Sequence, residues 1–319
     1  MFVKKYNQNK RVKKYHFCLL VNKQATNYNE RAIKKLIKSI LNNGHHFTVL
    51  EPNSAFSLYD QAQSAAGLKR HRGVVLSQVK KWGNITALIA CGGDGTFNLV
   101  ARAGFKSNLP VAVLPMGKFN NICQSVYKTV DPDKIIKKIL ARKHQIITIN
   151  AGEIADQMFF SSVGLGFIPK LQEILEEKKQ PRFGFGWSQF GTKAATIKLS
   201  KKTILKVDSF KFETSPKMIN VNLLPYSCGI PISNASLLDD GMCEIIFDVN
   251  VNTKKFGNYL SQIIKRKFVY GSDFRMYRGK SICIEPVEGY NLYLDGEIIE
   301  VPSDMIEITV LEKALKIFA

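Results

Sequence analysis

The feature of this sequence that most constrains its fold is an apolar segment that runs directly into a glycine-rich turn. Residues 86–91 are almost entirely apolar and predict a buried strand. They continue into a Gly-Gly-Asp-Gly-Thr turn at residues 92–96, and residues 96–103 then predict a helix. Glycines and a helix N-terminus together let backbone N–H groups approach an anion closely. The segment therefore predicts a phosphate-binding loop. The alternative is a tight turn in which Asp94 and Thr96 only cap the helix.

The first part of the chain alternates strands and helices, which predicts a parallel sheet with helices on both faces. The helix over residues 28–42 is predicted because apolar residues recur there at helical spacing, namely Ile33, Leu36, Ile37, Ile40 and Leu41. We expect strands over residues 15–22, 46–50, 86–91 and 111–115, and helices over residues 28–42, 53–66, 96–103 and 133–140.

The character of the sequence changes near residue 146. Apolar segments become short, often alternate with polar residues, and are separated by Gly, Pro, Asn and Asp, which predicts antiparallel strands. Two helices, over residues 170–179 and 254–265, are expected to interrupt them. The predicted fold is thus α/β: a three-layer parallel-sheet nucleotide-binding domain, residues 1–143, followed by an antiparallel β-sandwich-like domain, residues 144–308.

The composition favours a basic protein of the cytoplasm. Lys and Arg number 46 against 26 Asp and Glu, a net charge of +20, which attracts nucleotides, nucleic acid or acidic lipid surfaces. No apolar run reaches the length of about 20 residues that spans a bilayer. None of the six cysteines forms a CxxC pair, so we expect buried thiols in a reducing compartment.

Several motifs occur in an order that resembles one known family. The turn at residues 92–96 is followed by Asn98, and the strand ending at Pro115 is followed by Gly117 and Asn120. This pattern looks like the diacylglycerol kinase catalytic family, which includes sphingosine, ceramide and bacterial lipid kinases. Later segments resemble the same family, namely Leu238-Asp239-Asp240-Gly241-Met242, Leu294-Asp295-Gly296-Glu297 and the C-terminal strand at residues 309–319, which in the family returns to the first domain.

The resemblance implies ATP-dependent phosphorylation of a lipid hydroxyl with Mg2+, on a diacylglycerol-like substrate. ATP would lie in a cleft between the domains. Asp295 would be the general base and Glu297 would support it or the metal, whereas the motif taken alone reads as an exposed β-turn. Asp94 and Asp240 would hold metal, with a simple turn as the alternative at Asp240. The residues implied in nucleotide binding are Asn22, Gly92, Gly93, Asp94, Gly95, Thr96, Gly117, Lys118 and Asn120.

Five positions depart from the family pattern. Leu99 replaces a glutamate, and Asn121 and Asn150 replace two aspartates that join Asp94 in a metal network in the family. An amide brings no negative charge, so metal affinity is expected to fall. Lys118 adds a positive charge near the phosphate path, and Phe119 replaces a glycine. These changes indicate either altered nucleotide chemistry or lost catalysis.

Other functions stay open alongside the lipid kinase. They are a catalytically weak or inactive nucleotide- or lipid-binding protein of the same fold, an enzyme similar to NAD kinases, and, from charge alone, a nucleic-acid binder. We expect the lipid kinase to act at an anionic membrane surface without nucleic acid, and a homodimer is an alternative to a monomer. Four aromatic residues are expected either to line a lipid-entry face or to pack in the core, namely Phe183, Phe185, Trp187 and Phe190.

Overall fold

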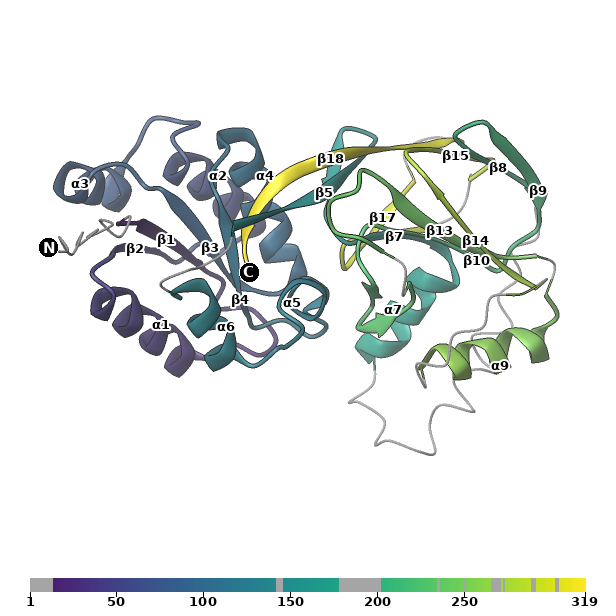
Figure 1. Ribbon diagram of the computed structural model, residues 1–319, viewed down its shortest axis with the longest axis horizontal. Coiled ribbons are helices and arrows are strands. Elements are labelled where there is room, and N and C mark those ends of the chain that lie inside the picture. Colours follow the sequence, from purple (N-terminus) through teal and green to yellow (C-terminus); the bar gives the residue numbers. More distant parts are fainter. Residues whose placement is uncertain are drawn as a thin grey trace, which may run out of the picture.

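The strands described in this protein form two large sheets and one short ribbon. The structure is a computed structural model that describes residues 14–141, 146–177, 202–233, 236–249, 251–264, 271, 273–287, 291–301 and 304–319. One sheet has ten strands, the other has six, and β11 (Tyr226–Ser227) pairs with β12 (Ile230–Pro231). Figure 1 shows the parallel part of the ten-stranded sheet on the left and the six-stranded sheet on the right.

Four parallel strands form the first part of the ten-stranded sheet, in the order β2-β1-β3-β4. Every residue of β1, β3 and β4 is buried, which explains why these segments are largely apolar along their whole length. The bounds of the four strands are β1 His16–Val21, β2 His46–Leu50, β3 Ala87–Gly92 and β4 Val111–Pro115.

Helices cover both faces of this parallel part, with α1 and α6 on one side and α2, α3 and α4 on the other (Figure 1). The side chain of Asn29 caps α1 by accepting the N–H of Ala32 at 3.1 Å, and Ile33, Leu36 and Ile40 of α1 are buried. The helix bounds are α1 Glu30–Asn42, α2 Ala55–Ala65, α3 Gly73–Trp82, α4 Asp94–Ser107, α5 Asn121–Val126 and α6 Pro132–Ile139.

A long C-terminal strand, β18 (Ile306–Phe318), joins the two halves of the ten-stranded sheet. It pairs in parallel with β4 and antiparallel with β5 (Ile146–Ile154) and β15 (Ser281–Glu285). From β15 the sheet continues through β8 (Thr203–Val207) to β9 (Phe210–Thr214), and β6 pairs with β5. Figure 1 shows β18 as the yellow strand that arches from the parallel sheet to the other end of the molecule. The bounds of β6 are Gln157–Phe159.

The six-stranded sheet is antiparallel at every pairing, in the order β14-β13-β10-β7-β16-β17. It packs on the far end of the ten-stranded sheet through aromatic side chains: the ring of Phe212 on β9 lies 5.8 Å from that of Phe247 on β13 and 4.3 Å from that of Tyr277 on β14. The bounds are β7 Ser162–Gly166, β10 Met218–Asn222, β13 Cys243–Asp248, β14 Phe274–Gly279, β16 Asn291–Leu294 and β17 Glu297–Glu300.

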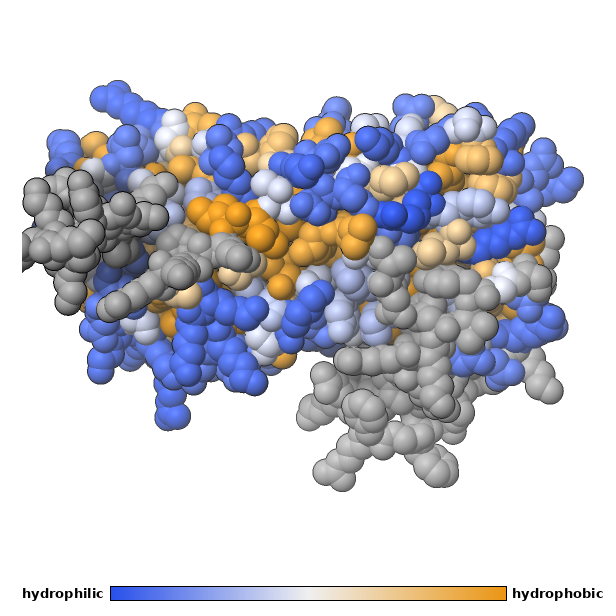
Figure 2. All heavy atoms as spheres, in the orientation of Figure 1, coloured by the Kyte–Doolittle hydropathy of each residue, from blue (hydrophilic) through white to orange (hydrophobic). Residues whose placement is uncertain are grey.

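Two helices contribute to a second, smaller hydrophobic core beside this sheet. Phe167 of α7 (Phe167–Glu177) packs edge-on against Phe256 of α9 (Thr253–Ile264), with ring centroids 5.3 Å apart. Met218 of β10 belongs to the same cluster. On the face shown in Figure 2, apolar residues form a band across the middle of the molecule, and hydrophilic residues dominate the margins.

The predicted fold class, α/β followed by an antiparallel β-rich part, is confirmed. Helix α4 begins at Asp94, two residues before the predicted start, and α3 and α5 were not predicted. The division into residues 1–143 with 309–319 and residues 144–308 stays a prediction. The aromatic residues at 183–190 lie outside the described residues. Within the described part of the chain, no helix is long and apolar enough to cross a membrane.

Candidate active site

The glycine turn brings the ends of β3 and β4 into direct backbone contact. A Cβ atom on Gly93 would lie 2.9 Å from the Cα of Gly117, and one on Gly117 would lie 2.4 Å from the Cα of Gly93. A Cβ on Gly92 would lie 2.3 Å from the Thr96 hydroxyl oxygen. Real Cβ atoms do not approach other atoms so closely, so only glycine fits at these three positions.

Polar side chains from neighbouring loops fix the shape of this turn. The Asn22 amide, directly after β1, donates to the Thr96 hydroxyl at 3.0 Å. The Asn120 side chain accepts the N–H of Gly117 at 2.9 Å and donates to its carbonyl at 2.9 Å. Asn27 also donates to the Gly117 carbonyl, at 2.7 Å. Three strand ends of the parallel sheet are thus joined where α4 begins, and the dipole of α4 favours negative charge there.

Asp94 lies in the first turn of α4 and is held by the start of α5. Its carboxylate accepts the N–H of Asn121 at 3.0 Å and that of Ile122 at 3.2 Å. Burial raises the pKa of Asp94 to about 6, although these two hydrogen bonds oppose the rise, and the nearby Asp295 carboxylate adds to it. Asp94 therefore changes charge near neutral pH.

Asp295 lies in the turn between β16 and β17, and its side chain points into the protein. Its carboxylate accepts four hydrogen bonds, from the amide of Asn98 at 3.0 Å and from three successive backbone N–H groups at 2.6, 2.7 and 3.0 Å. Those backbone groups belong to Phe160, Ser161 and Ser162. Burial raises the pKa of Asp295, and the four hydrogen bonds oppose that rise. Asp295 thus fastens the β16–β17 turn to the β6–β7 segment and to α4.

Glu297, two residues later, points the other way. It is exposed, and its Oε1 atom lies 3.1 Å from the position that a Cβ on Gly95 would take. The turn between Asp295 and Glu297 is held from α7, where the Gln172 amide donates to the Gly296 carbonyl. The chain therefore presents one carboxylate of this motif to the start of α4 and buries the other behind it.

A cavity of about 590 Å³ joins the glycine turn to the β16–β17 turn. Polar and charged residues line it from both halves of the molecule. Asp94 and Lys118 belong to the parallel half, and Gln172 and Glu297 belong to the antiparallel half. The Lys118 ammonium group also lies 5.5 Å from the centre of the Phe119 ring. The predicted site residues that line the cavity are Asn22, Gly93, Asp94, Gly95, Thr96, Gly117, Lys118 and Glu297.

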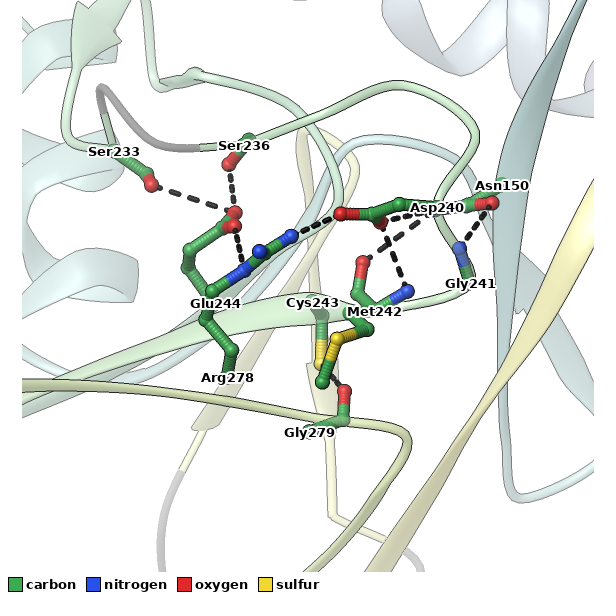
Figure 3. A network of polar contacts seen from close by, with 10 residues as sticks. All are labelled: Asn150, Ser233, Ser236, Asp240, Gly241, Met242, Cys243, Glu244, Arg278 and Gly279. Atoms are coloured by element: carbon green, nitrogen blue, oxygen red, sulfur yellow. Dashed lines mark hydrogen bonds and ion pairs between the residues drawn. The ribbon is translucent and has the colours of Figure 1, made fainter.

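Four predicted site residues do not line the cavity. Gly92 and Asn120 shape the loops beneath it, and Asp295 lies buried behind its wall. Asp240 belongs to a separate network with Arg278 and Asn150 (Figure 3). Across the described residues, no three His, Cys, Asp or Glu side chains converge to form a metal site.

Two residues that sequence reasoning did not assign to the site contribute to it. Asn98 follows the glycine turn in the motif, so its position could have indicated that it belongs to the site. In the structure it donates a hydrogen bond to Asp295. Gln172 had no such signal, because it is one of several polar residues on a predicted helix, and only the tertiary structure brings it to Gly296.

Both ends of the Asn121 amide have a hydrogen-bond partner. Asn121 is fully buried, its oxygen accepts the N–H of Gly229 at 2.8 Å, and its amino group donates to the Tyr293 hydroxyl at 3.4 Å. Leu99 lines the cavity at the position where a glutamate was expected. Leu99, Lys118 and Phe119 thus depart from the family pattern inside the cavity and Asn121 beside it, whereas Asn150 belongs to the separate network around Asp240.

The comparisons with known proteins agree with this geometry. Residues 16–154 match the family model described as the diacylglycerol kinase catalytic domain. Over these residues the chain is similar to the diacylglycerol kinase catalytic domain family. This region includes the glycine turn, Lys118 and the whole parallel sheet apart from β18.

Known proteins and structures resemble this chain over most of its length. A Staphylococcus epidermidis protein named "Putative lipid kinase" is 26% identical over 260 residues, 73% of this chain and 76% of its own. A Bacillus anthracis structure described as that of a diacylglycerol kinase superposes with a TM-score of 0.70 at 16% identity, and covers 95% of this chain and 96% of its own. At that identity the likeness concerns the fold.

Proposed function

We propose that this protein transfers the terminal phosphoryl group of ATP to the hydroxyl group of a diacylglycerol-like lipid. The observation that carries the proposal is the shared cavity, in which the glycine turn of one sheet faces Glu297 of the other. Phosphoryl transfer depends mainly on positioning and charge neutralisation, together with a base near the attacking hydroxyl. Both kinds of group line this cavity.

The phosphate groups of ATP would bind at the start of α4. There Gly93 and Gly95 leave the backbone open, and the helix N-terminus offers N–H groups that have no partner within the helix. Lys118 lines the same cavity and would neutralise part of the phosphate charge. In the reaction, the lipid oxygen bonds to the terminal phosphorus while the bond from that phosphorus to the oxygen of the departing ADP breaks.

We propose that Glu297 is the base that takes the proton from the attacking hydroxyl. Its carboxylate reaches the cavity beside Gly95, whereas the Asp295 carboxylate is buried and already accepts four hydrogen bonds. The resemblance implied the opposite division of roles. In our proposal Asp295 is a positioning residue, because it fixes the turn that carries Glu297.

The residues around the cavity fit Mg2+ that is shared with the phosphates of ATP. Mg2+ keeps several waters and is usually held by one or two carboxylates together with substrate phosphates. Of the two carboxylates that line the cavity, Asp94 would hold it together with the phosphates, since Glu297 is assigned to the attacking hydroxyl. When bound, Mg2+ neutralises charge on the transferring phosphoryl group.

A weakly active or inactive binding protein is the second candidate. The observation that favours it is the close fit of the Asn121 amide, together with Leu99 in the cavity, because both remove charge that the family places near the metal. Such a protein would still bind nucleotide at the glycine turn.

A transfer assay with ATP labelled on the terminal phosphate separates these functions. We expect labelled phosphatidic acid from diacylglycerol in mixed micelles with Mg2+, and only background label with Glu297→Gln. Wild-type label no higher than that of a reaction without protein, on diacylglycerol, sphingosine and ceramide, would leave the binding protein as the better account, whereas equal transfer by wild type and Glu297→Gln would remove Glu297 from the role of base. Label transferred to NAD instead would point to an NAD-kinase-like activity.

We further propose that the protein reaches its lipid at an anionic membrane surface. The support is the net charge of +20, since basic proteins are attracted to acidic headgroups. The lipid substrate and the acidic headgroups that attract the protein would then lie on the same membrane surface.

A further inference from the structure

A polar network at the junction of β5, β13 and β14 centres on Arg278 (Figure 3). The guanidinium group of Arg278, on β14, pairs with the Asp240 carboxylate and donates through Nε to Glu244 at 3.0 Å. The Glu244 side chain is only 1% exposed, and the Ser236 hydroxyl donates to its other oxygen. The guanidinium group therefore neutralises one desolvated carboxylate, Glu244, for which a missing partner is costly, while the Arg278 and Asp240 side chains are 33% and 22% exposed.

Asn150, on β5, completes the network with both ends of its amide. Its amino group donates to the Asp240 carboxylate at 3.3 Å and to the Met242 carbonyl at 3.4 Å. Its oxygen accepts the backbone N–H groups of Gly241 and Lys313, each at 3.2 Å. A carboxylate at position 150 would face the oxygens of Asp240 and Met242 with no hydrogen to donate. The site would then need an added cation between them.

The network joins segments that are distant in the sequence. Asn150 lies on β5, Lys313 on β18 and Gly241 in the turn before β13. Gly241 has a φ of +72°, and a Cβ there would lie 2.9 Å from the Glu312 carboxylate, so the turn is pressed against β18. These contacts fix the place where the long strand leaves the parallel sheet for the antiparallel part.

The residues around Asp240 do not fit the divalent cation expected there. The oxygens that would bind it, on Asp240 and Met242, already receive the amino group of Asn150, and Asp240 also pairs with Arg278. A guanidinium group stays protonated at any relevant pH. A divalent cation at this place would therefore either displace Arg278 or meet its positive charge at short range, where repulsion is strong.

We propose that the Arg278 guanidinium and the Asn150 amide together take the structural place of a divalent cation, so that this junction is stable without metal. The inference does not depend on the kinase function. It concerns the fold, and it separates any metal that accompanies ATP from a metal required by the structure.

The first test uses the full-length wild-type protein without nucleotide. We expect the thermal unfolding temperature to differ by less than about 1 °C between EDTA and millimolar Mg2+ or Ca2+, whereas a site filled at a hundred times its dissociation constant would shift it by roughly 5 °C. In calorimetric titration with Mg2+ or Ca2+, a saturable signal that Asp240→Asn abolishes would overturn the proposal. A signal that Asp240→Asn leaves intact comes from another place and agrees with it.

The second test moves the site toward metal binding. Arg278→Gln leaves Asp240 and Glu244 without their cation, so we expect a lower unfolding temperature in EDTA and a partial recovery with Ca2+ or Mg2+. The double variant Asn150→Asp/Arg278→Gln should recover further, and Arg278→Lys should stay insensitive to metal. Equal unfolding temperatures of wild type and Arg278→Gln in both conditions would contradict the proposal. If Arg278→Gln does not fold, the wild-type titration decides alone.

Discussion

At the scale of single residues, the two carboxylates of one short motif have opposite surroundings. Asp295 is buried among four donors, and Glu297 is exposed at the mouth of the cavity beside Gly95. The turn between them has positive φ at both Asp295 (+49°) and Gly296 (+108°), which directs the two side chains to different sides. Position in the motif therefore does not decide which acid faces the cavity; the local backbone does.

This division of roles predicts different effects for two matched substitutions. Glu297→Gln should leave stability unchanged and lower kcat by roughly 100-fold or more, because a positioned base contributes at least that factor. Asp295→Asn places an amino group against buried N–H donors, so it should cost about 2 kcal/mol in the free energy of unfolding. Denaturant unfolding and steady-state kinetics on both variants measure this. A fully stable but inactive Asp295→Asn would return the role of base to Asp295.

The raised pKa of Asp94 predicts a pH effect on stability. Burial lifts this pKa from 3.8 in the unfolded chain to about 6 in the folded protein, so the folded state holds the proton more tightly between those values. The contribution of Asp94 to stability is therefore greatest at low pH and falls as the pH rises to about 6. The unfolding free energy of wild type minus that of Asp94→Asn should decrease from pH 4 to pH 7. A difference that does not change with pH would refute the shift.

At the scale of elements, the site depends on how closely two loops approach. Gly93, which precedes α4, and Gly117, in the loop after β4, meet backbone to backbone, and Asn120 holds the second loop in place. The short helix α5 then supplies the N–H groups that hold Asp94. The proposed phosphate-binding loop thus consists of two loops in contact.

A single added methyl group should separate them. Gly93→Ala would place a Cβ 2.9 Å from the Cα of Gly117, so we expect a loss of about 1–3 kcal/mol in stability and a marked loss of ATP affinity. Gly271→Ala is the matched control, because a Cβ there meets no atom of the described residues within 4 Å and its backbone carries no positive φ. Calorimetric titration with ATP on both variants measures the effect. Unchanged ATP binding by Gly93→Ala would mean that the nucleotide binds elsewhere.

The elements that could be predicted from the sequence are those whose signal is local. The strand, glycine turn and helix at residues 86–107 have a local pattern, and the structure has them in that order. Helix α5 has six residues, too few to show a helical period, and α3 buries only Val75. The partners of Arg278 could not be predicted, because Asp240 and Glu244 are more than thirty positions away and only strand pairing brings them together.

At the scale of the whole molecule, β18 connects the two parts that form the cavity. It pairs with β4 in the parallel sheet and with β15 at the antiparallel end, so the C-terminal strand belongs to both. The cavity lies between the glycine turn and the six-stranded sheet, and the Arg278 network stabilises the junction nearby. The shape of the cavity therefore depends on the relative position of the two sheets.

The net charge of +20 predicts salt-dependent binding to acidic membranes. Vesicles that contain phosphatidylglycerol should carry the protein into the pellet at low ionic strength, and binding should fall as salt shortens the Debye length below about 10 Å. Vesicles of phosphatidylcholine alone are the control. Equal binding to both kinds of vesicle, or binding that salt does not weaken, would contradict an electrostatic attraction.

The most direct test of the central claim is a crystal structure of the protein with Mg2+ and a non-hydrolysable ATP analogue. We expect the β- and γ-phosphates on the backbone of Gly93 and Gly95, with Lys118 beside them and the Glu297 carboxylate facing the γ-phosphate across the cavity. A nucleotide bound away from the glycine turn, or a γ-phosphate that points away from Glu297, would contradict the proposed phosphoryl transfer.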